Sequence, residues 1–346
     1  MTPSQRKASG SYYTPDDVAQ CLARWVVRTE ADRLLDPSCG DGRFIAQHAN
    51  TVGIEQDAVA AQLAIARAPW ALVHEGDFFS WASHTHERFE CAAGNPPFIR
   101  YQTFRGEPRQ RALNLCASAG ARFSGLSSSW APFIVATATL LKAGGRLAFV
   151  VPAEIGHAPY SAPLLEYLCA NFGVVHVIAV RQKLFPKLSE DCWLLYAEGY
   201  GRSSAEIRFS ALRTFTPTPR PPISFTRVAL SAWRDDWNCR LRPFVLTAEA
   251  RDLYAECAAQ GDSRRLGDLA NVGIGYVSGA NDFFHLRPSE AASLRIPKSV
   301  LHPTVRNGRA LPTRRVTNET VENWFRNDEE VLLLRIGKEG KLPISV

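Results

Sequence analysis

The stretch LLDPSCGDGRF, residues 34–44, decides the fold, because it predicts a buried strand ending at Asp36, a glycine-rich turn and the start of a helix. Such a unit brings backbone N–H groups and a carboxylate to the carboxyl end of a sheet, where open α/β folds bind ligands. The third glycine of the dinucleotide fingerprint is absent, so this stretch alone is also compatible with an ordinary strand–helix turn.

Strand and helix patterns alternate on both sides of this stretch. Strands are predicted at residues 33–35, 51–55, 70–74, 89–93, 146–151, 174–180 and 193–198, and helices at 15–29, 44–49, 58–68, 130–142 and 247–260. The alternation predicts a parallel sheet with helices on both faces. Residues 101–128 are polar and rich in Gly and Ser, which predicts a long loop of a kind that is often functional.

The pattern changes near residue 200. Residues 213–224, RTFTPTPRPPIS, are rich in proline and predict a linker at 211–225. We therefore expect a first domain at residues 1–210 and a smaller C-terminal α+β domain at residues 226–346. The chain stops in VLLLRIGKEGKLPISV, a pattern typical of the middle of a structural unit, so we hypothesise that the last domain is incomplete.

Composition excludes several classes of protein. With 46% hydrophobic and 21% charged residues, most of the chain is globular rather than disordered. No apolar run reaches the roughly 18 residues of a membrane span, and the polar N-terminus has no signal-peptide core, so we expect a soluble cytoplasmic protein. The eight cysteines form no CxxC pair and no zinc-like spacing, so neither a metal site nor disulfides are expected.

The net charge of +6 falls entirely after residue 200. Residues 1–200 hold 18 basic and 18 acidic side chains, and 33 of the 40 basic residues of the chain are arginines. Arginine matches phosphate groups and the guanine edge better than lysine does. A GC-rich genome that favours arginine codons remains the alternative explanation.

Carboxylates follow three consecutive predicted strands. Asp36 ends the first, Glu55 in VGIEQD ends the second, and Asp77 in EGDFF follows the third. A carboxylate at the second position can accept hydrogen bonds from ribose hydroxyls, and one at the third can accept from an adenine amino group. No basic residue is placed to hold a pyrophosphate, so the pattern favours a nucleoside ligand over a dinucleotide.

Asn95-Pro96-Pro97-Phe98 follows the apolar strand FECAAG. The two prolines stiffen the backbone, so the carbonyl groups keep their directions, and an aromatic ring comes directly after them. In isolation these four residues are equally compatible with a plain proline-rich turn. Their position after the fourth strand of the series favours a functional site.

Taken in order, Thr14-Pro15, DPSCGDGRF, GIEQD, GDFF and NPPF resemble the adenine-specific DNA methyltransferases that use S-adenosylmethionine, and the long C-terminal extension resembles their gamma group. The resemblance covers residues 9–200 well and extends more weakly to 272–286, a segment similar to part of a target-recognition domain. It implies a Rossmann-like class I methyltransferase mixed sheet, with the catalytic domain at 1–210 and DNA target recognition at 226–346.

The resemblance also implies a cofactor site for S-adenosylmethionine, without a metal. Tyr13-Thr14-Pro15 matches the segment that closes over the methionine part, Asp36 and the turn at 38–42 match the amino-acid and sulfonium cradle, and Glu55 matches the ribose ligand. Asp77 with Phe78 matches the contact to the cofactor adenine. The implied cofactor-binding residues are Tyr13, Thr14, Pro15, Asp36, Ser38, Cys39, Gly40, Glu55, Gln56, Asp77, Phe78 and Asn95.

For catalysis, the resemblance implies that Asn95 and the Pro96 carbonyl bind the target amine, with Pro97 and Phe98 completing the catalytic motif. Phe98 and Phe185 match the two aromatic residues that hold the flipped base. Many relatives have Tyr where Phe98 stands, and Phe retains the stacking face. Asn at position 95 implies adenine rather than cytosine as the target, and no Pro-Cys dipeptide of a cytosine-C5 enzyme is present.

Double-stranded DNA is the implied partner, and a cognate restriction endonuclease is a further one, as a separate or missing polypeptide. Candidate phosphate contacts are Arg264, Arg265, Arg306, Arg309, Arg314 and Arg315, each of which also fits an ordinary surface charge. Two other functions remain open: a methyltransferase acting on protein glutamine or RNA, and a truncated, inactive chain that only binds DNA.

Overall fold

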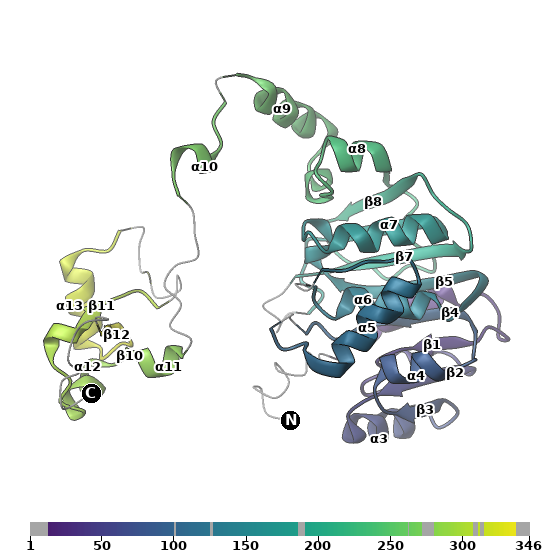
Figure 1. Cartoon of the computed structure of the whole chain (residues 1–346), viewed down its shortest axis with the longest axis horizontal. Helices are drawn as coiled ribbons and strands as arrows, with labels where there is room; N and C mark the ends of the chain where they lie inside the picture. Colours follow the sequence, from purple (N-terminus) through teal and green to yellow (C-terminus); the bar gives the residue numbers. More distant parts are fainter. Residues whose placement is uncertain are drawn as a thin grey trace. The chain divides into compact units, whose positions relative to one another are not determined.

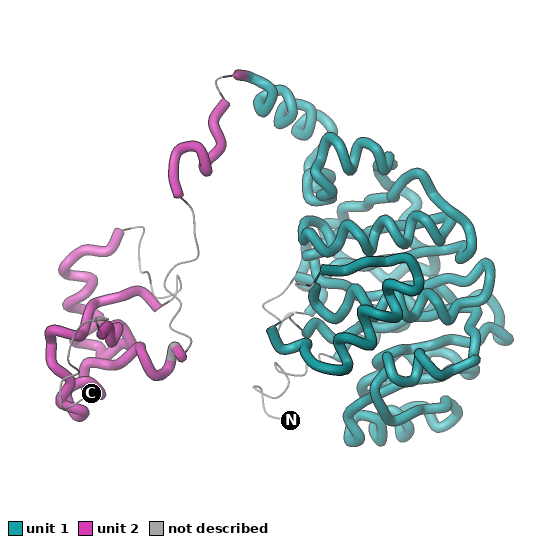
Figure 2. The backbone as a smooth tube through the Cα atoms, viewed as in Figure 1, with its two compact units in different colours: residues 1–260 teal, residues 261–346 magenta. Residues whose placement is uncertain are grey.

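The computed structural model describes residues 13–99, 102–124, 127–185, 191–261, 263–271, 280–306, 311 and 315–336. The chain forms two compact units, residues 1–260 and 261–346 (Figure 2).

The first unit is built on a nine-stranded sheet with the order β3-β2-β1-β4-β5-β7-β6-β8-β9 (Figure 1). Its strands are β1 (Leu34–Asp36), β2 (Thr51–Glu55), β3 (Leu72–Glu75), β4 (Phe89–Gly94), β5 (Leu141–Pro152), β6 (Phe172–Val180), β7 (Cys192–Tyr200), β8 (Glu206–Leu212) and β9 (Thr226–Ala229). Strands β1 to β5 pair in parallel, whereas β7 runs antiparallel between β5 and β6. The sheet is therefore mixed.

Helices cover both faces of this sheet. The helices of the first unit are α2 (Asp16–Val26), η1 (Ile45–Gln47), α3 (Ala58–Arg67), α4 (Phe78–His84), α5 (Gly106–Ser118), α6 (Trp130–Ala138), η2 (Ala153–Gly156), α7 (Ser161–Asn171), α8 (Leu230–Asp235), η3 (Arg242–Val245) and α9 (Ala248–Ala259). Of these, α9 buries no residue and packs on η3 rather than on the sheet. Because successive strand residues point to opposite faces, Cys91 and Ala93 pack under α2, whereas Ala92 packs with α6 and α7. The predicted α/β sheet with helices on both faces is confirmed.

The predicted long loop at 101–128 contains a helix, α5, so that prediction was wrong for residues 106–118. Residues 109–113 in its interior, RQRAL, are good helix formers, and Gly106 and Ser118 lie at its ends. Ala112 and Cys116, one turn apart, are buried and pack in the core together with α6.

The proline-rich residues 213–225 do not separate the two compact units. They connect β8 to β9, which pair antiparallel at the edge of the same sheet. Beyond them, Trp233 and Phe244 are buried in the main core, as apolar residues that belong to the first unit. The boundary between units therefore falls after residue 260 instead of within the expected linker at 211–225.

The second unit has an α+β structure around a three-stranded antiparallel sheet of order β10-β12-β11. Its elements are α10 (Leu266–Leu269), α11 (Asn281–Phe284), β10 (His285–Leu286), α12 (Pro288–Ser293), η4 (Lys298–Val300), β11 (Leu301–Pro303), α13 (Asn318–Arg326) and β12 (Leu332–Leu334). Leu286, Ala291, Leu332 and Leu334 form its small core. Across the described parts of both units, no helix combines the length and apolarity that crossing a bilayer requires.

Candidate active site

The carboxyl ends of β1, β2 and β4 meet where the strand order reverses direction, which is the usual ligand-binding position in open α/β sheets. Five residues of the predicted site lie together here. The Ser38 N–H donates to Asp36 Oδ1 (3.1 Å), and the Ser38 hydroxyl donates to the backbone carbonyl of Asn95 (3.2 Å). The Gly40 N–H donates to Glu55 Oε2 (2.9 Å). These contacts join the three strand ends into one site.

Asp36 is fully buried. In the described part of the chain its Oδ2 atom has no hydrogen-bond partner. Burial raises the pKa of the Asp36 carboxyl to about 8, and the negative charges of Glu55 and Asp41 act in the same direction. Burial disfavours the ionised form of Asp36, and a cation beside it would stabilise that form. The site therefore favours a positively charged ligand group.

The site needs glycine at two positions around Asp36. Gly42 has a positive φ of 86°, and a Cβ atom there would lie 2.8 Å from the Ala64 Cα of α3. Gly94, at the end of β4, lies so close to Asp36 that a Cβ atom would be 2.7 Å from its Oδ1. Both glycines therefore allow backbone segments to approach closely around the carboxylate.

Tyr13-Thr14-Pro15 lies over the same turn. A Cβ atom added at Gly40 would be 3.6 Å from Tyr13 Cε1, so the tyrosine ring lies against that glycine. Arg43 fixes the segment, because its Nη1 donates to the Thr14 carbonyl (3.0 Å) and its guanidinium lies 5.8 Å from the Tyr13 ring centre. Pro15 caps the start of α2.

The carboxylates of Glu55, after β2, and Asp77, after β3, stabilise the turns that follow these strands. Glu55 Oε1 accepts from the Asp57 N–H (2.8 Å), and burial raises the pKa of Glu55. Asp77 caps α4 by accepting from the Ser80 N–H (2.8 Å), and it lines a cavity of about 430 Å³. Gln56 is exposed beside Glu55.

Two residues assigned to the cofactor site turn their side chains into the core. The Phe78 ring is 3% exposed and stacks on Phe133 with ring centres 5.1 Å apart, so its assigned contact with adenine is not supported by its packing. Cys39 packs among Ile45 and Ala64, which leaves only its backbone to face the site. The apolar side chains at both positions are explained by core packing.

The Asn95-Pro96-Pro97-Phe98 corner is held by a residue that the sequence analysis missed. Ser129 is fully buried at the start of α6. Its hydroxyl donates to the Pro97 carbonyl and accepts from the Ile99 N–H (3.0 Å), while its own N–H donates to the Ile99 carbonyl (3.0 Å). Ser129 therefore fixes the corner to the start of α6.

A cavity of about 210 Å³ lies beside Phe98. Its polar lining was not predicted either, and includes Ser128, Glu154, His157, Asp191 and Arg242. Burial and the positive charge of Arg242 lower the pKa of His157, so its ring is predominantly neutral near pH 7. Phe185, the second predicted stacking residue, is 7% exposed in the core cluster under α2 and is not among the described residues that line this cavity.

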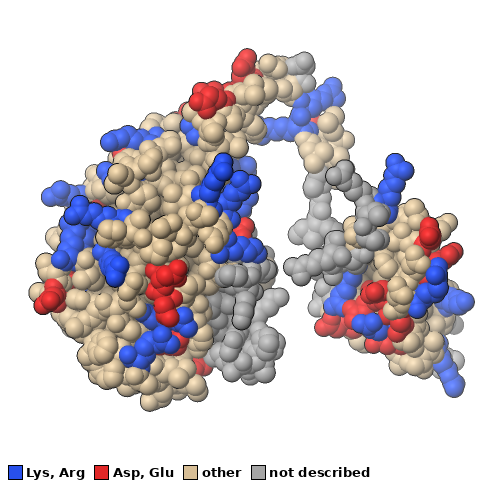
Figure 3. All heavy atoms as spheres, turned by 180° about the vertical axis from the view of Figure 1, so that it is seen from behind, with Lys and Arg blue, Asp and Glu red and all other residues tan. Residues whose placement is uncertain are grey.

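The predicted DNA-contacting arginines lie outside the first unit. Arg264, Arg265 and Arg315 are exposed, and Arg309 and Arg314 fall outside the described residues. Arg306 forms ion pairs with Asp282 and Glu330, so its charge is already compensated within the second unit, and the structure favours a stabilising role over phosphate contact. On the visible face of this unit, Lys and Arg are interspersed with Asp and Glu (Figure 3).

The mixed sheet and the ligand site at its switch point define a class I methyltransferase fold. Solved structures share it. The type I restriction-modification methyltransferase subunit from Streptococcus thermophilus has a TM-score of 0.53 at 16% identity, and covers 67% of this chain and 58% of its own. The DrdV–DNA complex has a TM-score of 0.58 at 11% identity, with 97% and 44% covered. The type IIG restriction endonuclease BpuSI has a TM-score of 0.56 at 16% identity, with 98% and 45% covered.

Three protein families match successive parts of the chain, and all three are families of DNA methylases or methyltransferases. Residues 1–66 match the family described as N-6 DNA Methylase, residues 48–185 match Eco57I restriction-modification methylase, and residues 240–344 match the C-terminal domain of the Type II methyltransferase M.Eco57I. These matches confirm the resemblance: the chain is related to the N6-adenine DNA methyltransferases of restriction–modification systems.

Individual relatives agree. The Type II methyltransferase M.XamI of Xanthomonas campestris pv. amaranthicola is 25% identical over 296 residues, which cover 79% of this chain and 52% of the relative. M.CvrRI of Paramecium bursaria Chlorella virus XZ-6E is 24% identical over 194 residues, which cover 54% and 47%. The chain thus spans about half the length of these curated relatives.

Proposed function

We propose that this chain transfers a methyl group from S-adenosylmethionine to the N6 amine of an adenine flipped out of duplex DNA, as part of a restriction–modification or defence system. The observation that carries the proposal is the position of the Asn95-Pro96-Pro97-Phe98 corner beside the buried carboxyl of Asp36 at the switch point of the sheet. The description of the family that matches residues 1–66, N-6 DNA Methylase, supports DNA as the substrate.

The residues of the site fit this cofactor. Its amino-acid part carries an ammonium group and is joined through two methylene groups to the sulfonium. Asp36 offers a buried carboxyl oxygen that lacks a hydrogen-bond partner in the described structure. Each oxygen of Glu55 already accepts one N–H and can accept a second donor, which suits a ribose hydroxyl. When bound, the cofactor supplies an electrophilic sulfonium methyl group.

The chain's own residues act on the target amine. The lone pair of an exocyclic amine on adenine is delocalised into the ring, which makes the nitrogen a poor nucleophile. Hydrogen bonds from its two N–H groups to Asn95 Oδ1 and the Pro96 carbonyl favour tetrahedral nitrogen and a localised lone pair. The prolines and Ser129 keep both acceptors in place, so that catalysis rests on positioning and electrostatics.

The target amine is inaccessible in a stacked duplex, so the base must leave the helix. Stacking on an aromatic ring contributes about 1–3 kcal/mol per base, which offsets part of the unstacking cost. Phe98 offers such a ring beside the cavity of about 210 Å³. We assign this cavity to the flipped base, with Glu154 and His157 as groups able to contact its edge.

We assign target recognition to the C-terminal region, where residues 201–346 hold all of the net positive charge. Exposed Arg264, Arg265 and Arg315 are the candidate phosphate contacts among the described residues. DNA cleavage would come from a cognate endonuclease on a separate polypeptide or on sequence outside these 346 residues.

The test is transfer of a tritiated methyl group from S-adenosylmethionine to unmethylated duplex DNA, followed by nucleoside analysis. The proposal predicts label in N6-methyladenosine. Label found only in protein glutamine or RNA would replace DNA by one of those substrates, and cofactor binding without transfer would indicate a chain that only binds DNA.

A further inference from the structure

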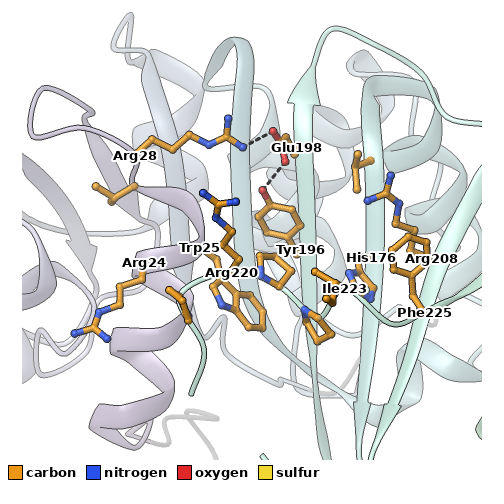
Figure 4. Close-up of a pocket in the computed structure, with 15 residues that line it drawn as sticks. Arg24, Trp25, Arg28, His176, Tyr196, Glu198, Arg208, Arg220, Ile223 and Phe225 are labelled. Carbon is orange, nitrogen blue, oxygen red and sulfur yellow. Dashed lines mark hydrogen bonds and ion pairs between the residues drawn. The ribbon is translucent and has the colours of Figure 1, made fainter. Parts of the chain in front are cut away.

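A third cavity, of about 870 Å³, lies on the face of the sheet that α2 covers (Figure 4). Side chains of β6, β7 and β8 form its floor, including His176, Tyr196 and Arg208. The C-terminal end of α2 and the proline-rich residues 219–223 form its walls. Its volume is within the range of roughly 300–1,000 Å³ that is usual for ligand sites.

The cavity is separate from the candidate active site. The floor residue Glu198 pairs in register with Arg146, on the amino-terminal side of β5, whereas the active site follows Gly94, which pairs with Phe149 further along that strand. Along α2, Tyr13 precedes the start of the helix and Arg28 follows its end. The eleven residues of α2 span about 16 Å at 1.5 Å each. The two sites therefore lie towards opposite ends of the strands.

The proline-rich wall is fixed in place. The Thr218 carbonyl accepts from Trp25 Nε1 (2.9 Å) on α2, and the Ser224 carbonyl accepts from the Ser210 hydroxyl (2.7 Å) on β8. Between these anchors, Pro219, Pro221 and Pro222 restrict the backbone. The segment that the sequence indicated as a linker thus forms a preorganised side of a cavity.

The lining of the cavity is strongly basic. Arg24, Arg28, Arg208 and Arg220 are among the 15 residues that line it, whereas Glu198 is the one carboxylate among them. The Arg24 side chain points away from Glu198 (Figure 4). Arg28 is paired with Glu198, which also accepts from the Tyr196 hydroxyl (2.7 Å). Within the described structure Arg208 and Arg220 form no ion pair, so the cavity holds about two uncompensated positive charges.

The positive charge is permanent and comes from arginine alone. Burial, together with the charge of Arg208, lowers the pKa of His176 to about 4, so its ring is neutral at pH 7 and bonds to the Ser210 hydroxyl (2.8 Å). Arg208 is held over the Phe225 ring, with its guanidinium carbon 4.7 Å from the ring centre. Guanidinium groups oriented in this way match phosphate oxygens in charge and geometry.

We propose that this cavity binds a phosphate-bearing ligand, either a free nucleoside phosphate or a phosphate of a nucleic-acid strand, at a site distinct from the methyl-transfer site. Two uncompensated arginines, Arg208 on the floor and Arg220 on the proline-rich wall, favour a multiply charged anion. A phosphate group supplies both the charge and several acceptor oxygens.

Isothermal titration calorimetry on the full chain tests this inference with two probes. ADP represents the free nucleotide, and a short oligothymidylate represents a strand that lacks adenine and cannot be methylated at N6. Excess S-adenosylhomocysteine is present throughout, so that ADP does not occupy the cofactor site. The test variant is Arg208→Gln/Arg220→Gln. The control, Arg88→Gln/Arg234→Gln, removes the same charge from two exposed positions outside the cavity.

At least one probe is expected to bind the wild type, and to bind the test variant weaker by roughly tenfold or more, with less than about a twofold effect in the control. Binding of ADP alone identifies a free nucleotide, and binding of the oligothymidylate alone identifies a strand. Failure of both probes to bind the wild type, or equal weakening in both variants, overturns the inference. Arg220→Gln alone, at an exposed position, decides the case if the double variant melts at a lower temperature.

Discussion

At the residue scale, the sequence predicted best the side chains whose role depends on their position after a strand. Asp36, Glu55 and Asn95 lie together at one edge because each ends or follows a parallel strand. Ser129 could not be predicted in this way, since its contact with the corner joins residues about 30 positions apart. The core position of Phe78 was missed for a similar reason: its partner Phe133 comes from a helix far along the chain.

The carboxyl of Asp36 gives the cofactor-free protein a characteristic pH dependence. Because burial raises its pKa to about 8 in the fold, the native state retains a proton that the unfolded chain loses above pH about 4. The free energy of unfolding of the wild type therefore falls as the pH rises from about 4 towards 8, and this pH dependence comes from Asp36. Asp36→Asn removes it, so the variant should gain stability relative to the wild type between pH 5 and 8, by at most about 4 kcal/mol.

Urea unfolding at several pH values, without cofactor, measures this difference. A constant difference between the two proteins from pH 5 to 8 would show that Asp36 is already ionised in the fold.

Ser129→Ala leaves the Pro97 carbonyl and the Ile99 N–H without their partner. We expect a loss of about 1–3 kcal/mol in stability and slower methyl transfer, with cofactor affinity retained because Asp36 and Glu55 are unaffected. The control is Ser127→Ala, which removes another buried hydroxyl of the same run, bonded to the Ser124 carbonyl (3.0 Å) instead of the corner. Equal transfer rates in the two variants would contradict a positioning role for Ser129.

At the element scale, the predicted strands of the first half were found because their apolar runs end at Gly, Pro or acidic residues. The helix α5 was missed because flanking Gly and Ser residues dominated the composition of residues 101–128. Strands β8 and β9 were missed because their pairing is set by tertiary contact across a proline-rich connection, which local patterns do not report.

The strand–turn–helix unit depends on the absence of a side chain at position 42. In Gly42→Ala, the new Cβ would meet the α3 backbone at 2.8 Å in a conformation with φ of 86°. We expect a destabilisation of roughly 1–3 kcal/mol together with weaker cofactor binding. Thermal melting and calorimetry measure both effects. Gly267→Ala, where an added Cβ meets nothing within 4 Å, is the control, and similar effects in both variants would exclude this explanation.

At the scale of the whole molecule, sequence composition placed the domain boundary too early. Proline-rich sequence is typical of linkers, but here it lies inside the first unit, whose core includes Trp233 and Phe244. Burial of these two aromatic residues by a segment after the prolines could be seen only in three dimensions.

This boundary predicts how the chain tolerates truncation. A chain ending at residue 260 should unfold cooperatively and bind the cofactor with wild-type affinity, because every residue of the candidate cofactor site lies in the first unit. A chain ending at residue 212 loses β9, Trp233 and Phe244 and should be severely destabilised. Circular dichroism melting distinguishes the two, and equally stable products would place the boundary near residue 212 after all.

The central claim is that the corner at Asn95 acts on the amine and not on the cofactor. It is tested most directly by the single-turnover rate of methyl transfer by Asn95→Ala at saturating cofactor, with the exposed Asn114→Ala as control. We predict a rate lower by roughly 10²–10³-fold, while the cofactor dissociation constant stays within about twofold of wild type. An unchanged rate, or a loss of cofactor affinity as large as the loss of rate, would contradict the claim.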